Sequence, residues 1–184
     1  TLATPNLTQA YWIYLAAGAL LAAGFADFAL VGFHFQKANI MPGNLIPVFY
    51  AVAMAASALA SIPLGRLFDR LGPNVSLFAF LISAAAAPFV FLGASSFAVI
   101  GMIFWGIGMS AQGSLFQAML TGVIPPQKRS TAFGLFDTGY GMAWFLGSVV
   151  MGLLYDKSIL AVVLFSVILQ LVAIPLLFIA NKKR

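Results

Sequence analysis

Residues 159–180 read ILAVVLFSVILQLVAIPLLFIA, an apolar run in which no side chain carries a formal charge. A helix rising ~1.5 Å per residue over such a run crosses the ~30 Å hydrocarbon core of a bilayer. Five further apolar runs precede it, at 11–35, 46–67, 74–92, 97–120 and 131–154. Turn-forming Gly, Pro and Asn residues and charged residues separate the runs. The sequence therefore predicts an all-α polytopic membrane protein with six transmembrane helices.

The composition supports a membrane protein and excludes several chemistries. Of 184 residues, 62% are hydrophobic and 7% are charged, with a mean hydropathy of +1.04, whereas soluble domains carry ~25% charged residues. The chain has no cysteine and no glutamate, and its one histidine is His34. Disulfides, thiolate metal sites and cysteine nucleophiles are thereby excluded. The serine–histidine dyad of an intramembrane protease is also excluded, because the chain has no histidine after residue 34. We expect no enzyme activity, metal or cofactor.

The basic residues predict the orientation in the membrane. Six spans place both termini on one side of the bilayer, and short loops rich in Lys and Arg stay in the cytoplasm. Lys37 and Lys157 fall on one side. Seven bases fall on the other: Arg66, Arg70, Lys128, Arg129, Lys182, Lys183 and Arg184. We expect a multi-pass protein of the cell membrane with both termini cytoplasmic. The net charge of +5 is interpreted as this topology signal, with no nucleic-acid partner.

A short pattern occurs twice. Gly65-Arg-Leu-Phe-Asp69-Arg70 ends the second span, and Gly152-Leu-Leu-Tyr-Asp156-Lys157 ends the fifth. Three spans separate the copies, so they lie on opposite faces of the bilayer. This predicts one bundle built from two inverted three-helix repeats, about 9–92 and about 97–181. The alternative is a chance match, because charged residues commonly end membrane helices.

The same region carries a family resemblance. Residues 65–72, GRLFDRLG, resemble the signature loop between the second and third helices of a major facilitator half. Residues 128–147 are similar to the cytoplasmic start of that family's eleventh helix. Pro73-Asn74 departs from the pattern by replacing its two final basic residues. The resemblance implies the C-terminal six-helix half of a twelve-helix transporter that carries a small solute by alternating access.

That resemblance also implies a partner, because the family's solute site lies between two six-helix bundles. The second bundle is either an N-terminal half or another copy of this chain. The sequence leaves open whether the chain is a fragment, a natural half-transporter or a homodimer. It also leaves open a channel or a non-transporting scaffold, which saturable solute uptake distinguishes from a carrier.

The resemblance implies a conformational latch in the first copy of the repeated pattern. Gly65 and Gly72 allow close approach and a sharp turn, with Asp69 and Arg70 between them. Asp69 is expected to lean on the N-terminus of the helix that begins near Ser130. A carboxylate there contributes ~0.3–1 kcal/mol when exposed, which is small enough to break during a transport cycle. The alternative is a solvated turn charge.

Polar residues within spans predict the solute pathway, since they are costly in lipid and usually face an interior or a cavity. Helical spacing groups Asp27 with His34 in the first span, and Ser110, Ser114, Gln117 and Thr121 in the fourth. The third and sixth spans are expected to be peripheral, apart from a lone Gln170. The candidate solute or coupling residues are Asp27, His34, Tyr50, Ser57, Gln112, Ser114, Gln117, Asp137, Tyr140 and Trp144.

Two carboxylates are the sharpest of these candidates. Asp27 lies ~16 residues into the first span, where an ionised carboxylate needs water or a partner. It is expected to take up a proton, to bind a cation or to be hydrogen-bonded as the neutral acid, with His34 as its partner. Asp137 lies near the start of the fifth span, where either pairing with Arg129 or Arg66 or a role in solute binding is expected.

Overall fold

The computed structural model describes residues 7–183. Within them, six helical stretches are long and apolar enough to cross a membrane: Gln9–Lys37, Gly43–Leu71, Val75–Leu92, Ser95–Thr121, Pro126–Tyr155 and Ile159–Lys182. These stretches match the six predicted spans, the third to within one residue, so the all-helical, six-span prediction is confirmed.

Eight α-helices make up these spans in the described part of the chain. They are α1 (Gln9–Gly24), α2 (Phe28–Lys37), α3 (Ile46–Leu71), α4 (Val75–Leu92), α5 (Ser95–Ser110), α6 (Phe116–Thr121), α7 (Arg129–Tyr155) and α8 (Ile159–Lys182). Short 3₁₀ turns, Gly43–Leu45 and Pro126–Lys128, precede α3 and α7, and a π-helical segment, Ala111–Leu115, joins α5 to α6.

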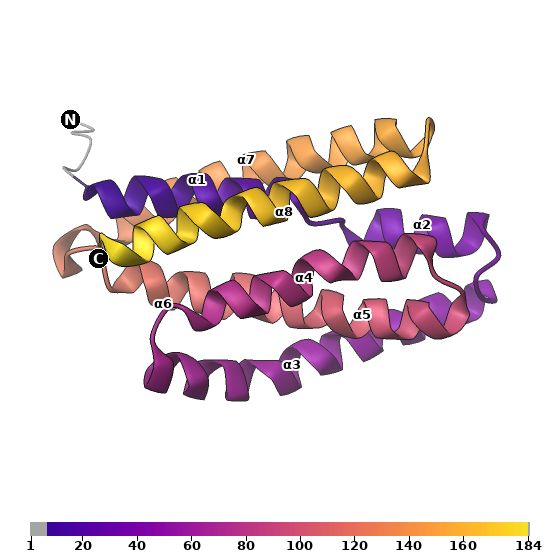
Figure 1. The fold of residues 1–184 in the computed structure, drawn as a ribbon, viewed down its shortest axis with the longest axis horizontal. Coiled ribbons are helices and arrows are strands. Elements are labelled where there is room, and N and C mark those ends of the chain that lie inside the picture. The colour runs from indigo at the N-terminus through magenta and orange to yellow at the C-terminus, as the bar shows by residue number, and fades with distance from the viewer. Residues whose placement is uncertain (1–6, 184) are drawn as a thin grey trace.

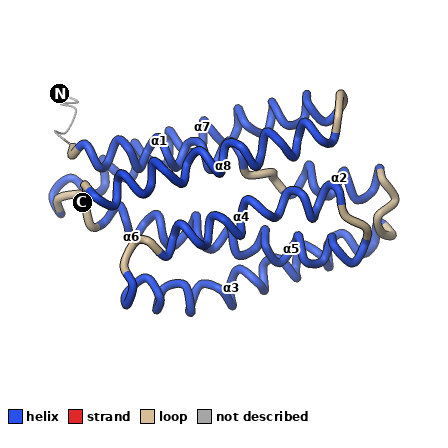
Figure 2. Tube along the Cα trace, in the orientation of Figure 1, coloured by secondary structure: helices blue, strands red, loops and turns tan. Residues whose placement is uncertain are grey.

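The first span is broken, so the prediction of one continuous helix over 11–35 is wrong. α1 ends at Gly24, and α2 begins at Phe28. Figure 2 shows the break as a loop in the middle of the bundle. Asp27 is the N-cap of α2, and its Oδ1 accepts a hydrogen bond of 2.8 Å from the backbone N–H of Leu30. A short polar side chain that bonds its neighbouring backbone competes with the continuous helix.

The fourth span is irregular at the corresponding depth. Its π-helical segment changes the helical register between Ser110 and Phe116. Ser110 is buried, whereas Ser114 is exposed and its hydroxyl donates to the Ser110 carbonyl oxygen at 2.6 Å. The predicted single polar stripe through Ser110 and Ser114 is therefore wrong, because it assumed an unbroken α-helical period.

The helices pack as two groups joined in the middle. α1 lies against α7 and α8, and α5 lies against α3 and α4, while α4 and α8 pack against each other. Figure 1 shows the first group along the upper side of the bundle and the second along the lower side. α1 begins and α8 ends at the same end of the bundle, where the α3–α4 and α6–α7 connections also lie (Figure 1). Six of the seven bases on that side of the sequence lie in or near these connections and the end of α8, and so at one end of the bundle, while Arg184 lies outside the described residues.

Glycine allows the closest helix contacts in each group. A Cβ added at Gly147 of α7 would overlap the Ala23 carbonyl oxygen of α1, and one added at Gly106 of α5 would overlap the Ala53 carbonyl oxygen of α3. Small residues let membrane helices approach until their backbones touch. These two glycines therefore set how closely α1 meets α7 and how closely α5 meets α3.

We predict that Gly147→Ala destabilises the bundle by about 1–3 kcal/mol, the usual cost of overpacking, because a backbone oxygen cannot move aside. Gly152→Ala is the matched control on the same helix, since nothing lies within 4 Å of its added Cβ. Thermal unfolding in detergent is the measurement. Equal midpoints for the two variants would contradict the close α1–α7 contact.

Candidate functional site

A cavity of about 180 Å³ lies between the α5–α6 region and α7. It brings together five of the predicted site residues, Gln112, Gln117, Asp137, Tyr140 and Trp144. The other lining residues are Met109, Gly113, Phe116 and Phe136. Four of the nine lining residues have charged or polar side chains, namely Gln112, Gln117, Asp137 and Tyr140, and they come from two different spans. The cavity is thus mostly apolar with a few polar groups, as small-molecule sites usually are.

Three aromatic rings from α7 form one wall of the cavity. Phe136, Tyr140 and Trp144 are spaced four residues apart, which places them on one face of the helix. The Phe136 and Tyr140 rings stack with their centroids 5.9 Å apart, and the Tyr140 and Trp144 rings meet edge to face at 5.9 Å. Such ring pairs hold one another in place. The wall is therefore a fixed aromatic surface beside Asp137.

The π-helical segment supplies the facing wall. Gln112 lies within it and is 6% exposed, and its side-chain Oε1 accepts a hydrogen bond from the Tyr140 hydroxyl. Its Nε2 is buried and has no hydrogen-bond partner. Nothing lies within 4 Å of a Cβ added at Gly113, so this wall is open beside Gln112. A buried amide donor without an acceptor is costly, which makes Gln112 an obvious point for a ligand to bind.

Asp137 lacks the partners expected for it. The Arg129 guanidinium instead donates to the Thr121 carbonyl oxygen at 3.5 Å, at the end of α6. Within residues 7–183, no ion pair joins Asp137 to Arg129 or Arg66, so that prediction is wrong. Asp137 is exposed on the cavity side of α7, eight residues after its first residue, a rise of ~12 Å along the helix. Its carboxylate is therefore available to a ligand.

The remaining predicted site residues lie outside this cavity. Asp27 is half-buried as the cap of α2, and Tyr50 packs its ring 4.5 Å from that of Phe28. Ser57 is half-buried on α3, and Ser114 bonds to its own helix. The structure therefore separates the first- and second-span candidates from those of the fourth and fifth spans.

His34 does not pair with Asp27 as predicted. It is 2% exposed, and its Nδ1 lies 2.9 Å from the Tyr155 hydroxyl at the end of α7. The Lys37 ammonium lies 5.1 Å from the Tyr155 ring centroid and 5.2 Å from that of Phe33. A cation over an aromatic face is attracted by the ring quadrupole. These contacts fasten α2 to α7, so His34 joins two helices.

A buried polar network was missed by the sequence reasoning, which treated Gln170 as isolated. The Ser166 hydroxyl donates to the Gly24 carbonyl oxygen at 2.6 Å, and the Gln170 amide donates to the same oxygen at 3.3 Å. Ser83 of α4 donates to Gln170 Oε1 at 2.7 Å. The Trp105 indole donates to the Ala26 carbonyl oxygen at 2.7 Å. A sequence signal existed, since a helix break at Asp27 leaves carbonyls that nearby polar side chains must satisfy.

The predicted latch residues surround a sharp turn at the end of α3. Gly72 has φ of 76° and its N–H donates to the Phe68 carbonyl oxygen at 2.9 Å, so the turn expected at this glycine is confirmed. Asp69 and Arg70 are exposed. In the described chain, no hydrogen bond joins Asp69 to the start of α7, and nothing lies within 4 Å of a Cβ added at Gly65. The predicted contacts of Asp69 and Gly65 are thus not formed in this structure.

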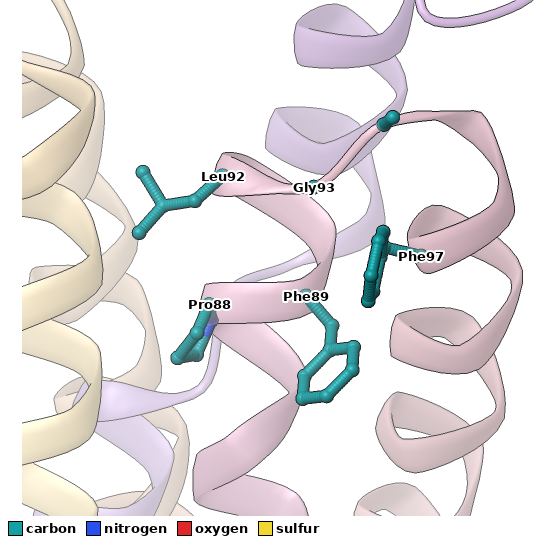
Figure 3. A pocket seen from close by; sticks show the side chains of 6 residues that line it. Pro88, Phe89, Leu92, Gly93 and Phe97 are labelled. Atoms are coloured by element: carbon teal, nitrogen blue, oxygen red, sulfur yellow. The ribbon is translucent and has the colours of Figure 1, made fainter.

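A second hollow lies at the α4–α5 connection and differs in character. It has a volume of about 300 Å³ and is lined by Pro88, Phe89, Leu92, Gly93, Ala94 and Phe97. Figure 3 shows the Pro88, Leu92, Phe89 and Phe97 side chains around it. None of these side chains can hydrogen-bond, so the hollow lacks groups that would orient a polar solute.

Comparison with known proteins assigns the family. The model of the Major Facilitator Superfamily matches residues 7–184. The chain belongs to the major facilitator superfamily. Two similar proteins are the uncharacterized protein Rv2265 of Mycobacterium tuberculosis (strain ATCC 25618 / H37Rv) and the uncharacterized protein Mb2288 of Mycobacterium bovis. Each is 31% identical over 172 residues, which cover 94% of this chain and 42% of the relative. The chain thus spans less than half the length of these relatives.

We predict that Asp27→Ala destabilises the protein by about 1 kcal/mol, because it removes the N-cap of α2, whereas Asp27→Asn keeps the cap and the stability. Thermal unfolding of both variants in the same detergent is the measurement. If Asp27→Asn lost as much stability as Asp27→Ala, the charge and not the cap would be what matters at this position.

Proposed function

We propose that the chain forms one wall of a secondary transporter that moves a small solute across the bilayer by alternating access. The observation that carries this proposal is the cavity of Gln112, Asp137 and Tyr140, with polar groups inside the span and an aromatic wall. Membership of the major facilitator superfamily supports transport over an enzyme or a scaffold. The proposal leaves the coupling ion and the direction of transport unassigned.

We propose that a second six-helix bundle, an N-terminal half or another copy of this chain, covers the face formed by α3 and α7. α3 buries Ala53 alone. α7 exposes large apolar side chains, among them Met142 and Phe145 with 62% and 68% of their surface exposed. Large apolar surface on an edge of a membrane bundle is available to lipid or to another helix. Closing the solute site requires the second bundle.

The helix contacts support the proposed inverted repeat of about 9–92 and about 97–181. If the first three spans are exchanged with the last three, the α1–α7 and α1–α8 contacts become the α5–α3 and α5–α4 contacts. All four contacts are observed. The exchange also relates the Ala23–Gly147 approach to the Ala53–Gly106 approach. The first span of each triplet is irregular, by the break before α2 and by the π-helical segment.

We propose that Asp69 and Arg70 act as a latch in another state of the transport cycle. Their exposure beside the Gly72 turn leaves both side chains available to a moving partner. A contact at a helix N-terminus worth ~0.3–1 kcal/mol is weak enough to form in one state and open in the next.

The transport proposal predicts saturable uptake into proteoliposomes for at least one solute in a panel of cations, neutral compounds and carboxylates. Trp144→Ala is expected to lower that uptake at least tenfold, because it removes part of the cavity wall. Trp12→Ala is the matched control, since Trp12 is exposed on α1 and does not line the cavity. Non-saturable flux would indicate a channel, and folded protein without any uptake would contradict transport. A particle mass of one 19.5 kDa chain in active samples would contradict pairing.

We propose that the end of the bundle where α1 begins and α8 ends faces the cytoplasm, with both termini on that side of the membrane. The chain has no cysteine, so single cysteines report topology without background. Ser130→Cys is expected to resist a membrane-impermeant maleimide applied to whole cells, and Asn39→Cys is expected to react. Both positions are exposed and lie in or near connections. The opposite labelling pattern would reverse the orientation.

A further inference from the structure

We infer that the cavity between the α5–α6 region and α7 takes an organic monocation that also carries a hydrogen-bond acceptor. This inference rests on the proposed function and assigns the class of solute. Asp137 receives the cationic group, the rings of α7 line one side of it, and Gln112 donates to the acceptor.

The charge of the cavity favours a cation. Asp137 is the one lining residue with a formal charge, and no lysine or arginine lines the cavity. Arg129, the nearest base along the chain, bonds to the Thr121 carbonyl oxygen instead. A carboxylate within a membrane span needs water or a positive partner, because lipid and aromatic side chains solvate it poorly, and a bound cation supplies such a partner. An anionic solute would meet this carboxylate with nothing to offset the repulsion.

The aromatic wall favours an organic cation over a bare metal ion. The rings of Phe136, Tyr140 and Trp144 line the cavity with Asp137. Aromatic ring faces attract alkyl-substituted ammonium groups. A hard metal ion needs several oxygen ligands instead. In the described residues, no group of three or more His, Cys, Asp or Glu side chains is placed to hold a metal.

Gln112 favours a ligand that carries a hydrogen-bond acceptor. Its Oε1 is occupied by the Tyr140 hydroxyl, while its buried Nε2 has no partner. The volume of about 180 Å³ is below the ~300–1,000 Å³ of sites for drug-sized ligands. The cavity is therefore of a size to hold a small cationic head group.

Four probes of nearly equal size separate charge from shape: choline, its neutral isostere 3,3-dimethylbutan-1-ol, the anion 3,3-dimethylbutanoate, and propyltrimethylammonium, which replaces the choline hydroxyl with a methyl group. Binding to the full chain in the uncharged detergent dodecyl maltoside is followed by calorimetry and by tryptophan fluorescence. We expect choline to bind at least tenfold more tightly than the neutral and anionic probes. We expect propyltrimethylammonium to bind several-fold more weakly than choline.

Variants then assign the contacts. Asp137→Asn is expected to bring choline within twofold of its neutral isostere. Asp156→Asn, the matched control at the C-terminal end of α7, is expected to keep the full preference, because Asp156 lies outside the cavity. Gln112→Leu is expected to abolish the difference between choline and propyltrimethylammonium. A difference between choline and propyltrimethylammonium that persists in Gln112→Leu would overturn the role of Gln112.

The outcomes separate this inference from the transport proposal. Equal or tighter binding of the neutral or anionic probe to the unmodified chain would overturn the cation assignment, and that comparison does not depend on any variant folding. A preference retained in Asp137→Asn would overturn the role of Asp137. If the four probes fail to bind while another solute shows saturable, Trp144-dependent uptake, the cation inference fails and the transport proposal stands. If no solute binds or is taken up, both fail.

Discussion

Backbone N–H and C=O groups inside a membrane span have no water to bond with, and each one left unpaired is expensive. The loop between α1 and α2 brings this constraint into the middle of the bundle. The Gly24 carbonyl oxygen at the end of α1 accepts hydrogen bonds from Ser166 and Gln170, and the Ala26 carbonyl oxygen accepts one from Trp105. Asp27 caps the first turn of α2. The break is therefore held by side chains from two other spans, the fourth and the sixth. Those contacts join α5 and α8 to the loop between α1 and α2.

The packing of the bundle follows from this arrangement. Ser83 of α4 bonds to Gln170 of α8, so the network joins the two triplets where α4 and α8 meet. With α4 and α8 in contact, α1 and α5 are covered, while α3 and α7 are left at the edges. The polar groups of the spans thus serve two purposes. Ser166 and Gln170 of α8 and Trp105 of α5 satisfy the break, whereas Gln112, Gln117 and Asp137 line the cavity.

The candidate site depends on a second irregularity. The π-helical segment at Ala111–Leu115 contributes Gln112 and Gly113 to the cavity, and the regular aromatic face of α7 lies opposite them. π-helical segments are rare and frequently occur at functional sites. Regular helix geometry predicted the α7 wall, since Asp137, Tyr140 and Trp144 follow its period. It did not show that Gln112 lies opposite Tyr140, because the period fails within the segment that contains Gln112.

The sequence by itself determined the class, the six spans and the family, because long apolar runs and a short Gly–Asp–Arg loop are local signals that need no knowledge of packing. It also named five residues that line one cavity in the structure: Gln112, Gln117, Asp137, Tyr140 and Trp144. Tertiary structure alone decided that Asp27 is a helix cap, that His34 meets Tyr155 and that Gln170 satisfies a broken helix. The physical reason is that a polar residue in a span must be paired, and its partner lies on a helix far away in the sequence. Spacing along one helix shows which residues share a face, and only the packed bundle shows what that face meets.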